Sequence, residues 1–332
     1  MRLSICIPTY NRSDQLRGTL DSFLSQTQDG VEIVISDNAS VDDTEQMVET
    51  YRSRFPSIVY HRWPENMGAD RNFLKVIELA RGDYCWLFGS DDSVSQGAVG
   101  KALAMLGDKS DVYLFNRLEC NLQMKPLGRR LPLALNEPRV FRFSTPSILE
   151  EYLDLTRNLS GAFGYLSSIV LRRAAWNATS YDEQFTGSAY SYTSILLTML
   201  RDGGTLHYDP GLVVNTRIGE DSFSAHGTAS RILIDLNGYG AIRDRIFAGM
   251  PRVQLRINTL LQREYPWWVL ARRRLMIDRK DWEQIRTSLR QIGYSRVKLL
   301  LAELLFRFRG ILMLALWSKR QLTRWRIRSG AA

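Results

Sequence analysis

Short apolar runs and helical repeats alternate along the first 120 residues of the chain. Five apolar runs have the length of buried strands and lie at residues 3–7, 31–35, 58–63, 84–88 and 112–115. Between these runs, apolar residues recur every three or four positions, as Leu16, Leu20 and Phe23 do after the first run. Strands that alternate with helices predict an α/β fold with a doubly wound, mostly parallel sheet.

The second helix should open with a capping box, because Ser40 and Asp43 precede apolar residues at helical spacing. Beyond residue 120 the pattern is less regular. We expect, in order, a loop over residues 125–137, a helix from about residue 147, a strand over 165–171, a helix over 190–200 and a strand over 206–215. We place a domain boundary after residue 230.

Residues 231–332 form a region of different composition, in which Trp, Leu, Arg and Lys dominate from about residue 253 onward. Its longest apolar stretch, residues 299–317, contains Glu303, Arg307 and Arg309, and three charges make a membrane-spanning helix costly. A helical, amphipathic region that lies on a bilayer fits better, with basic residues on anionic head groups. The alternative, which is compatible with the first, is a helical hairpin that packs on the preceding domain.

The charge of the chain predicts an anionic partner. Lys and Arg number 44 against 35 Asp and Glu, which gives a formal net charge of +9. Nucleic acid, phospholipid head groups and phosphate-bearing substrates all satisfy that charge. The aromatic and basic residues cluster in apolar helical stretches rather than on a predicted sheet, which favours lipid over RNA. We therefore predict a membrane surface as a partner and no nucleic acid.

The cysteines and the N-terminus indicate a reducing compartment. Cys6, Cys85 and Cys120 have the spacing of neither a zinc site nor a disulfide framework. The N-terminus begins directly with a strand-like run, without a basic segment or a cleavage site, so we expect no secretory signal.

Polar segments follow the ends of the first four predicted strands. They are Pro8-Thr-Tyr-Asn-Arg12, Ser36-Asp-Asn-Ala-Ser40, Asn66-Met-Gly-Ala-Asp-Arg-Asn72 and Gly89-Ser-Asp-Asp92. Ligands of a doubly wound sheet lie at the carboxyl ends of its strands, so these segments should form one site. In this order and at this spacing, they closely resemble glycosyltransferase family 2, whose members have the GT-A fold. The resemblance implies a nucleotide-sugar-binding part over residues 1–120, an acceptor side over residues 121–230, and a catalytic domain over residues 1–230.

The resemblance also implies roles on the donor side. Pro8, Thr9 and Tyr10 match the segment that packs on the base and ribose of the nucleotide, and Asp37 matches the acid that hydrogen-bonds the base. The same motifs supply further candidates for contact with the nucleotide-sugar, namely Arg12, Asn38, Asn66, Gly68, Arg71 and Asp91.

The acidic pair after the fourth strand is the candidate metal site. A hard divalent cation held by carboxylates neutralises a departing diphosphate without proton chemistry. The resemblance implies that Asp92 binds Mg²⁺ or Mn²⁺, with Asp91 near the ribose and the metal shell. Residues 217–226 resemble a loop that closes over the donor phosphates, where Arg217 would meet the diphosphate and His226 the diphosphate or the metal.

The sequence does not assign the general base to a single residue. Many inverting members carry Gly-Glu-Asp before a helix, and the acid of that motif deprotonates the acceptor. Here Ser188 and Ala189 replace the acid pair, in a Gly-Ser-Ala-Tyr-Ser-Tyr version that resembles the abequosyltransferase-like subgroup of bacterial O-antigen synthesis. The remaining candidate carboxylates are Asp182, Glu183, Glu220 and Asp221.

Together these features predict an inverting, metal-dependent glycosyltransferase. It would move a sugar from a nucleoside diphosphate-sugar to a hydroxyl of a saccharide carried on a polyprenyl diphosphate. The expected location is the cytoplasm, peripheral on the inner face of the bacterial cytoplasmic membrane. A nucleotidyltransferase is the enzymatic alternative, although it would carry a Gly-rich, Lys- or Arg-bearing loop after the first strand. A non-enzymatic protein that binds membranes or RNA is the other alternative.

Overall fold

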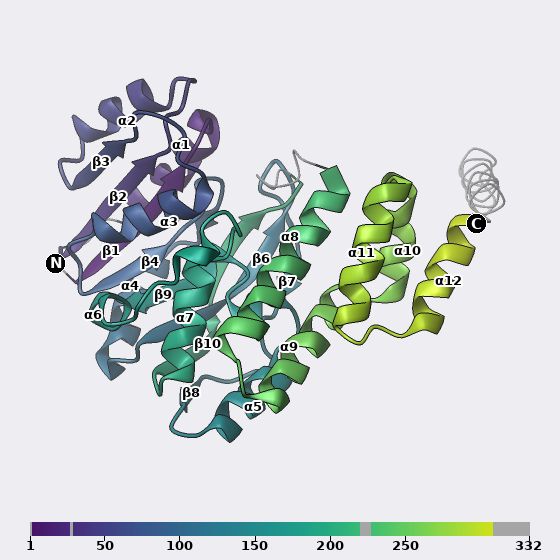
Figure 1. Ribbon diagram of the computed structural model, residues 1–332. Coiled ribbons are helices and arrows are strands. Elements are labelled where there is room, and N and C mark those ends of the chain that lie inside the picture. The colour runs from purple at the N-terminus through teal and green to yellow at the C-terminus, as the bar shows by residue number, and fades with distance from the viewer. Residues whose placement is uncertain (1, 27–28, 220–226, 308–332) are drawn as a thin grey trace, which may run out of the picture.

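A twisted central sheet carries helices on both faces and continues into a helical extension (Figure 1). The structure, a computed structural model, describes residues 2–26, 29–219 and 227–307. Within these residues the strands are β1 (Leu3–Thr9), β2 (Val31–Asp37), β3 (Ile58–Arg62), β4 (Tyr84–Leu87), β5 (Ser93–Val94), β6 (Val112–Cys120), β7 (Pro126–Arg130), β8 (Arg139–Arg142), β9 (Ile169–Arg172) and β10 (Thr205–Arg217). The α-helices are α1 (Ser13–Leu24), α2 (Thr44–Arg52), α3 (Ala69–Glu78), α4 (Ala98–Met105), α5 (Pro146–Leu155), α6 (Arg173–Asn177), α7 (Ser191–Arg201), α8 (Gly227–Ala241), α9 (Pro251–Glu264), α10 (Trp267–Arg273), α11 (Arg279–Gln291) and α12 (Arg296–Arg307).

The sheet has a parallel half and a mixed half. Strands β3, β2, β1 and β4 lie side by side in that order and are all parallel. Strand β9 pairs antiparallel with both β4 and β6, and β6 runs parallel to the long strand β10. Strands β5 and β8 pair antiparallel with β10, and β7 pairs antiparallel with β6. The predicted α/β fold with a central, mostly parallel sheet is confirmed.

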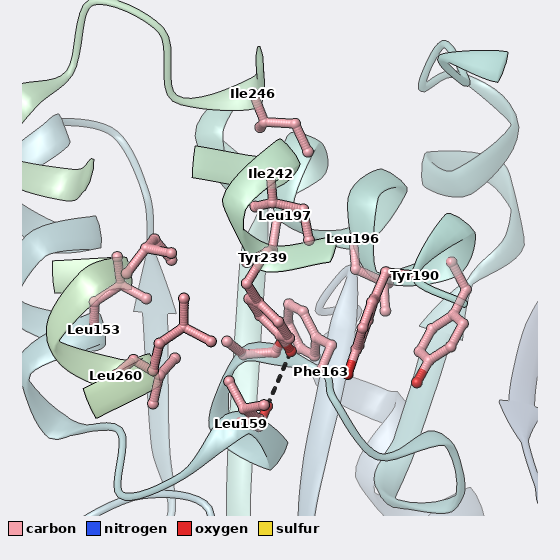
Figure 2. Close-up of a cluster of buried hydrophobic side chains, with 14 of the residues drawn as sticks. Leu153, Leu159, Phe163, Tyr190, Leu196, Leu197, Tyr239, Ile242, Ile246 and Leu260 are labelled. Atoms are coloured by element: carbon pink, nitrogen blue, oxygen red, sulfur yellow. Dashed lines mark hydrogen bonds between the residues drawn. The ribbon is translucent and has the colours of Figure 1, made fainter. Parts of the chain in front are cut away.

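Different helices cover the two faces of the sheet, because successive side chains of a strand point to opposite faces. In β1, Ile5 and Ile7 belong to the core that includes α1, α2 and α4. Cys6, between them, belongs to the other core, which includes α3, α5 and α7. Figure 2 shows part of this second core, where the hydroxyl of Tyr239 in α8 donates a hydrogen bond to the carbonyl of Leu159.

The helical region predicted after residue 230 is present as far as the description reaches, and the boundary predicted there falls inside α8. Ile232 and Leu236 of α8 lie in the same core as β9 and α7. Helix α11 packs on α8 and α12 packs on α10, while Nε1 of Trp282 donates to Oε2 of Glu303 at 2.7 Å. In the described part of the chain, no helix has the length and apolar character needed to cross a bilayer.

The predicted start of the second helix is wrong. Helix α2 begins at Thr44, whose backbone N–H donates to the side chain of Asp42 at 3.1 Å. Ser40 instead accepts a hydrogen bond from the backbone N–H of Asn11 at 2.8 Å, which ties two site loops together.

One loop prediction and one strand prediction also need correction. The loop expected over residues 125–137 contains β7, which is mostly exposed and so leaves no apolar signal. The strand expected over residues 165–171 begins instead with a 3₁₀ turn, Leu166–Ser168, and becomes β9 only at Ile169.

Candidate active site

Parallel pairing brings three of the predicted motifs to one edge of the sheet. Thr9, the last residue of β1, is in register with Asp37, the last residue of β2. On the other side of β1, Cys6 is in register with Leu87 at the end of β4. The chain after β4 therefore leaves the sheet beside the end of β1, which places the acidic pair in the crevice where such sheets bind ligands.

Asp92 is a buried carboxylate with both oxygens engaged. Its Oδ2 accepts hydrogen bonds from the hydroxyls of Tyr165 and Ser167. Its Oδ1 accepts the backbone N–H of Arg217 at 3.1 Å. Two side chains from the segment before β9 and one backbone amide of β10 thus fix the position and rotation of this carboxylate.

Two arginines lie at Asp91. The guanidinium of Arg12, the last residue of the polar segment at the end of β1, forms an ion pair with the Asp91 carboxylate. Nε of Arg217 donates to the Asp91 carbonyl at 3.2 Å. Two predicted donor-side cations therefore converge on the acidic pair, where a diphosphate would need them.

The environment of the pair disfavours two negative charges. Burial first, and then repulsion from Asp91, raise the pKa of Asp92 to about 7. Burial also raises the pKa of Asp91, although the Arg12 guanidinium opposes that shift. A divalent cation would relieve both effects, and oxygen ligands of this kind are those that Mg²⁺ and Mn²⁺ accept.

The donor set of this pair fits a metal that the substrate helps to hold. Among residues 2–26, 29–219 and 227–307, no group of three His, Cys, Asp or Glu side chains is placed to hold a metal ion. Mg²⁺ is commonly bound by one or two carboxylates together with substrate phosphates, and Asp91 and Asp92 match that arrangement.

The predicted base-reading acid is engaged within its own loop. Oδ1 of Asp37 accepts the backbone N–H and the hydroxyl of Ser40, at 2.9 and 2.5 Å. Oδ2 accepts the hydroxyl of Tyr60 at 2.7 Å. Because the side chain is fully buried, Asp37 shapes the loop after β2, and its role toward a base stays a prediction.

The structure brings Asn38 and Asn66 together. Nδ2 of Asn38 donates to Oδ1 of Asn66 at 2.8 Å, and Oδ1 of Asn38 accepts the Met67 N–H at 2.8 Å. Gly68, at the start of α3, has a φ of +84°, a left-handed conformation that glycine adopts without strain. The loops after β2 and β3 are thus joined into one wall of the crevice.

The remaining donor-side candidates differ in exposure. Pro8 and Thr9 are buried at the end of β1, whereas Tyr10 is 43% exposed. Arg71 lies exposed on α3. Their contacts with a nucleotide stay predictions.

A cavity of about 340 Å³ opens beside the acidic pair. Asp91 and Asp92 line it, and so do Arg231, Asp235 and Glu264 from α8 and α9. The motif analysis missed the second group, because it comes from the part of the chain without a family signature. It also missed Tyr165, Ser167 and Arg117, whose guanidinium lies 4.2 Å from the Tyr165 ring centroid.

Part of the cavity lining is a buried polar network around Asp235. Asp235 accepts hydrogen bonds from the hydroxyls of Tyr190 and Tyr265 and pairs with Arg231 at 2.7 Å. Burial raises the pKa of Asp235, although Arg231 opposes the shift. A sequence signal existed, because Asp235 interrupts the apolar positions of α8 and follows Arg231 by four residues.

The structure places the predicted catalytic acids apart from this cavity. Asp182 pairs with Arg245 at 2.6 Å and caps a 3₁₀ turn, and it lines a separate cavity of about 800 Å³. Glu183 accepts a hydrogen bond from the Thr186 hydroxyl at 3.1 Å. Because neither acid lines the cavity beside Asp91 and Asp92, neither is carried into the proposal below.

Three further candidates cannot be placed. Glu220, Asp221 and His226 lie outside the described residues.

Comparisons with known proteins agree with this geometry. Residues 4–175 match the family model described as Glycosyl transferase family 2. The abequosyltransferase RfbV of Salmonella typhimurium is 35% identical over 274 residues, which covers 80% of this chain and 82% of RfbV.

Solved structures also share the fold. S. aureus TarS 1–349 in complex with UDP superposes with a TM-score of 0.57 at 16% identity, over 90% of this chain and 88% of TarS 1–349. The Pyrobaculum calidifontis mannosyltransferase PcManGT, in complex with GDP-Man and Mn²⁺, gives 0.56 at 14% identity, over 96% and 88%. The chain therefore belongs to glycosyltransferase family 2, in its abequosyltransferase-like subgroup, and is an enzyme that transfers glycosyl groups.

Proposed function

We propose that this enzyme transfers a sugar, with inversion and in a metal-dependent reaction, from a nucleoside diphosphate-sugar to a hydroxyl of a lipid-linked saccharide in bacterial O-antigen synthesis. The observation that carries the proposal is the pair Asp91 and Asp92, held at the sheet edge between Arg12 and Arg217 and open to one cavity. The similarity to an abequosyltransferase, and the nucleotide-sugars bound by proteins of the same fold, support the donor class.

Each donor-side residue has a task in this proposal. Arg12 and Arg217 would lie against the diphosphate and offset its charge as the sugar leaves. Mg²⁺ or Mn²⁺ held by Asp91 and Asp92 would supply further charge neutralisation at the leaving diphosphate. The hydrogen bonds from Tyr165 and Ser167 to Asp92 would keep that carboxylate in place before the substrate arrives.

The acceptor side supplies a second requirement. An inverting transfer needs a carboxylate that removes the proton of the acceptor hydroxyl as that hydroxyl attacks the anomeric carbon. Asp221 remains our candidate for this base, because it belongs to the segment predicted to close over the donor. Asp235 accepts hydrogen bonds from two tyrosine hydroxyls and pairs with Arg231. These contacts suit a carboxylate that positions Arg231 better than one that removes a proton from the acceptor.

A panel of UDP-, GDP-, CDP- and dTDP-sugars tests the donor class. With Mn²⁺ present, one nucleotide-sugar should raise the melting temperature of the protein and should be consumed when saccharide acceptor is added. The alternative, a nucleotidyltransferase, would instead release pyrophosphate from a nucleoside triphosphate. Stabilisation by triphosphates alone would overturn the proposal.

We also propose contact with a membrane surface through the C-terminal helices. Helix α12 presents an exposed apolar stripe at helical spacing, Val297, Leu300, Leu301 and Leu304, with exposures of 66, 58, 40 and 39%. Trp268 and Met276, on and just after α10, are 60 and 66% exposed, and α10 packs on α12.

Charge around this stripe supports a bilayer as the partner. Arg272, Arg296 and Lys298 are exposed beside the apolar positions. Apolar side chains flanked by Lys and Arg suit an interface with anionic lipids. The sequence continues with further basic residues, from Lys319 to Arg328, which we expect to contribute and which lie outside the described residues. This contact would hold the enzyme on the inner face of the cytoplasmic membrane, where a lipid-linked acceptor is found.

A further inference from the structure

A third cavity, of about 370 Å³, is lined by seven residues, and four of them are arginines. Four of its residues are Arg129, Arg130, Arg157 and Arg263, and the single acidic residue among its lining is Glu264. We name it the arginine cavity. Four guanidinium groups around one concave space form a strong positive field, and guanidinium is the side-chain group that binds phosphate with two parallel hydrogen bonds.

The arginine cavity adjoins the catalytic cavity. Arg130 and Glu264 line both of them. Between the two lies the short 3₁₀ turn Leu159–Ala162, which begins after Asn158 in the arginine cavity and contributes Ser160 to the catalytic cavity. A molecule that fills both cavities would therefore place a phosphate-bearing part in one and a sugar in the other.

The elements that form the shared wall are fixed in position. Glu264 accepts the backbone N–H of Leu159 at 3.1 Å and pairs with Arg130 at 3.3 Å. Nδ2 of Asn158 donates to the Leu131 carbonyl at 2.9 Å, and its Oδ1 accepts the Ser160 N–H at 3.0 Å. These contacts hold the shared wall in place, and the side chains of Arg129 and Arg157 lie exposed beside it.

The charges of this cavity are only partly neutralised. Glu264 is shared by Arg130 and a backbone amide, and Nη1 of Arg263 donates to the Thr156 carbonyl at 2.7 Å. In the described part of the chain, no carboxylate lies within ion-pair distance of Arg129 or Arg157. Two guanidinium groups are therefore left for an anion from outside the protein.

The surroundings indicate what that anion is attached to. Glu264 ends α9, and α10 begins at Trp267 after the corner at Pro266. Exposed Trp268 thus follows the arginine cavity by only a few residues and belongs to the apolar surface that α10 and α12 present. An amphiphile would fit this arrangement, with its phosphate head in the basic cavity and its apolar chain on the apolar surface beside it.

We propose that the arginine cavity binds the diphosphate of the acceptor's isoprenoid carrier while the acceptor sugar enters the catalytic cavity. This assignment rests on the proposed function, because it presumes a lipid-linked acceptor. Arg129 and Arg157 bind the phosphates, and Arg130 lines both cavities. The isoprenoid chain extends from the arginine cavity along α10. The subsite thereby selects acceptors that carry a charged lipid anchor.

Farnesyl diphosphate is the probe for this subsite. Its binding to the full chain is measured by calorimetry in the presence of EDTA, so that no metal at Asp91 and Asp92 can hold the diphosphate. The variant carries Arg129→Gln and Arg157→Gln together, and the control is Arg142→Gln, an exposed arginine of β8. We expect the double variant to bind at least about tenfold more weakly and the control to bind as wild type does. Inorganic pyrophosphate should compete with the probe.

The assignment is overturned if the double variant binds farnesyl diphosphate as tightly as wild type does. If that variant at the same time loses sedimentation with phosphatidylglycerol vesicles, the arginines bind lipid head groups instead. Because the measurement uses neither donor nor turnover, its outcome is separate from that of the proposed transfer reaction. An unchanged melting temperature of the double variant shows that both side chains were removed from a folded protein.

Discussion

The carboxylate of Asp70 accepts the backbone N–H of Ala189 at 2.8 Å. The same carboxylate accepts the N–H groups of Gly187 and Ser191 at 2.8 and 3.0 Å. Ala189 has a φ of +67°, a left-handed conformation that costs a residue with a Cβ free energy. The loop in which Ser188 and Ala189 replace the family's acid pair is therefore held by an acid from α3, a motif residue to which the sequence assigned no role.

Asp70→Asn should lower the free energy of unfolding by about 1–3 kcal/mol, because an amide cannot accept all three N–H groups that lie at its position. Urea unfolding measures this change. Glu78→Gln, an exposed substitution on the same helix, serves as the control and should stay within about 0.5 kcal/mol. Equal stability of Asp70→Asn and wild type would show that the loop does not depend on this carboxylate.

Asp37→Ala should weaken binding of the free nucleotide by about 1–3 kcal/mol if its carboxylate carries a buried hydrogen bond to the base. Tyr60→Phe is the matched control, since it removes one partner of Asp37 and leaves the carboxylate. We expect near wild-type binding by Tyr60→Phe, measured by calorimetry. Equal losses in both variants would assign Asp37 to the structure of the loop alone.

Asp111 should stabilise the fold at neutral pH and not at low pH. Burial opposes ionisation of Asp111, but hydrogen bonds from Arg172 and Thr205 outweigh it and lower the pKa of the carboxyl. The unfolded chain, with an Asp pKa of about 3.9, binds the proton more readily, so this stability is present above about pH 4 and is lost as pH falls through the folded pKa. Asp111→Asn should therefore destabilise the protein at pH 7 and much less at pH 2.5. A pH-independent difference in the denaturant midpoint would contradict this.

If the exposed apolar stripe of α12 contacts the membrane, charged substitutions in it should abolish lipid binding and leave the protein folded. Leu300→Asp with Leu304→Asp puts two charges on the exposed apolar face, at 58 and 39% exposure, without touching buried Leu299 or Ala302. Sedimentation with phosphatidylglycerol vesicles should fall strongly, while the melting temperature should hold. Leu255→Asp, on α9 and 64% exposed, is the control. Unaltered sedimentation of the double variant would assign membrane contact to another part of the chain.

The parallel half of the sheet could be predicted from the sequence because β1, β2 and β4 are short apolar runs that are buried on both faces. The site motifs followed from this, since the ends of parallel strands meet at one edge. Strand β7 could not be predicted, because it is exposed and is held by pairing with β6 instead of by an apolar face.

The acceptor side was harder to predict because its residues meet through long-range packing. Arg231, Asp235 and Glu264 join Asp92 in one cavity only after α8 and α9 fold back over the sheet. Asp182 lies in sequence just before Ser188 and Ala189, which replace the family's acid pair, yet its pairing with Arg245 holds it at another cavity. Local sequence motifs predict which residues lie at the ends of strands, whereas contacts between helices that are distant in sequence leave no local pattern.

The central claim is that Asp92 holds the metal that sugar transfer requires. The most direct test measures transfer from the preferred nucleotide-sugar by wild type, by Asp92→Asn and by Asp29→Asn, each with Mn²⁺ and with EDTA. Asp29 is an exposed acid before β2, at the opposite edge of the sheet.

Wild type and Asp29→Asn should be active with Mn²⁺ and inactive in EDTA, while Asp92→Asn should lose at least about 100-fold in rate with an unchanged circular dichroism spectrum. Full activity of Asp92→Asn, or wild-type activity that persists in EDTA, would contradict the account.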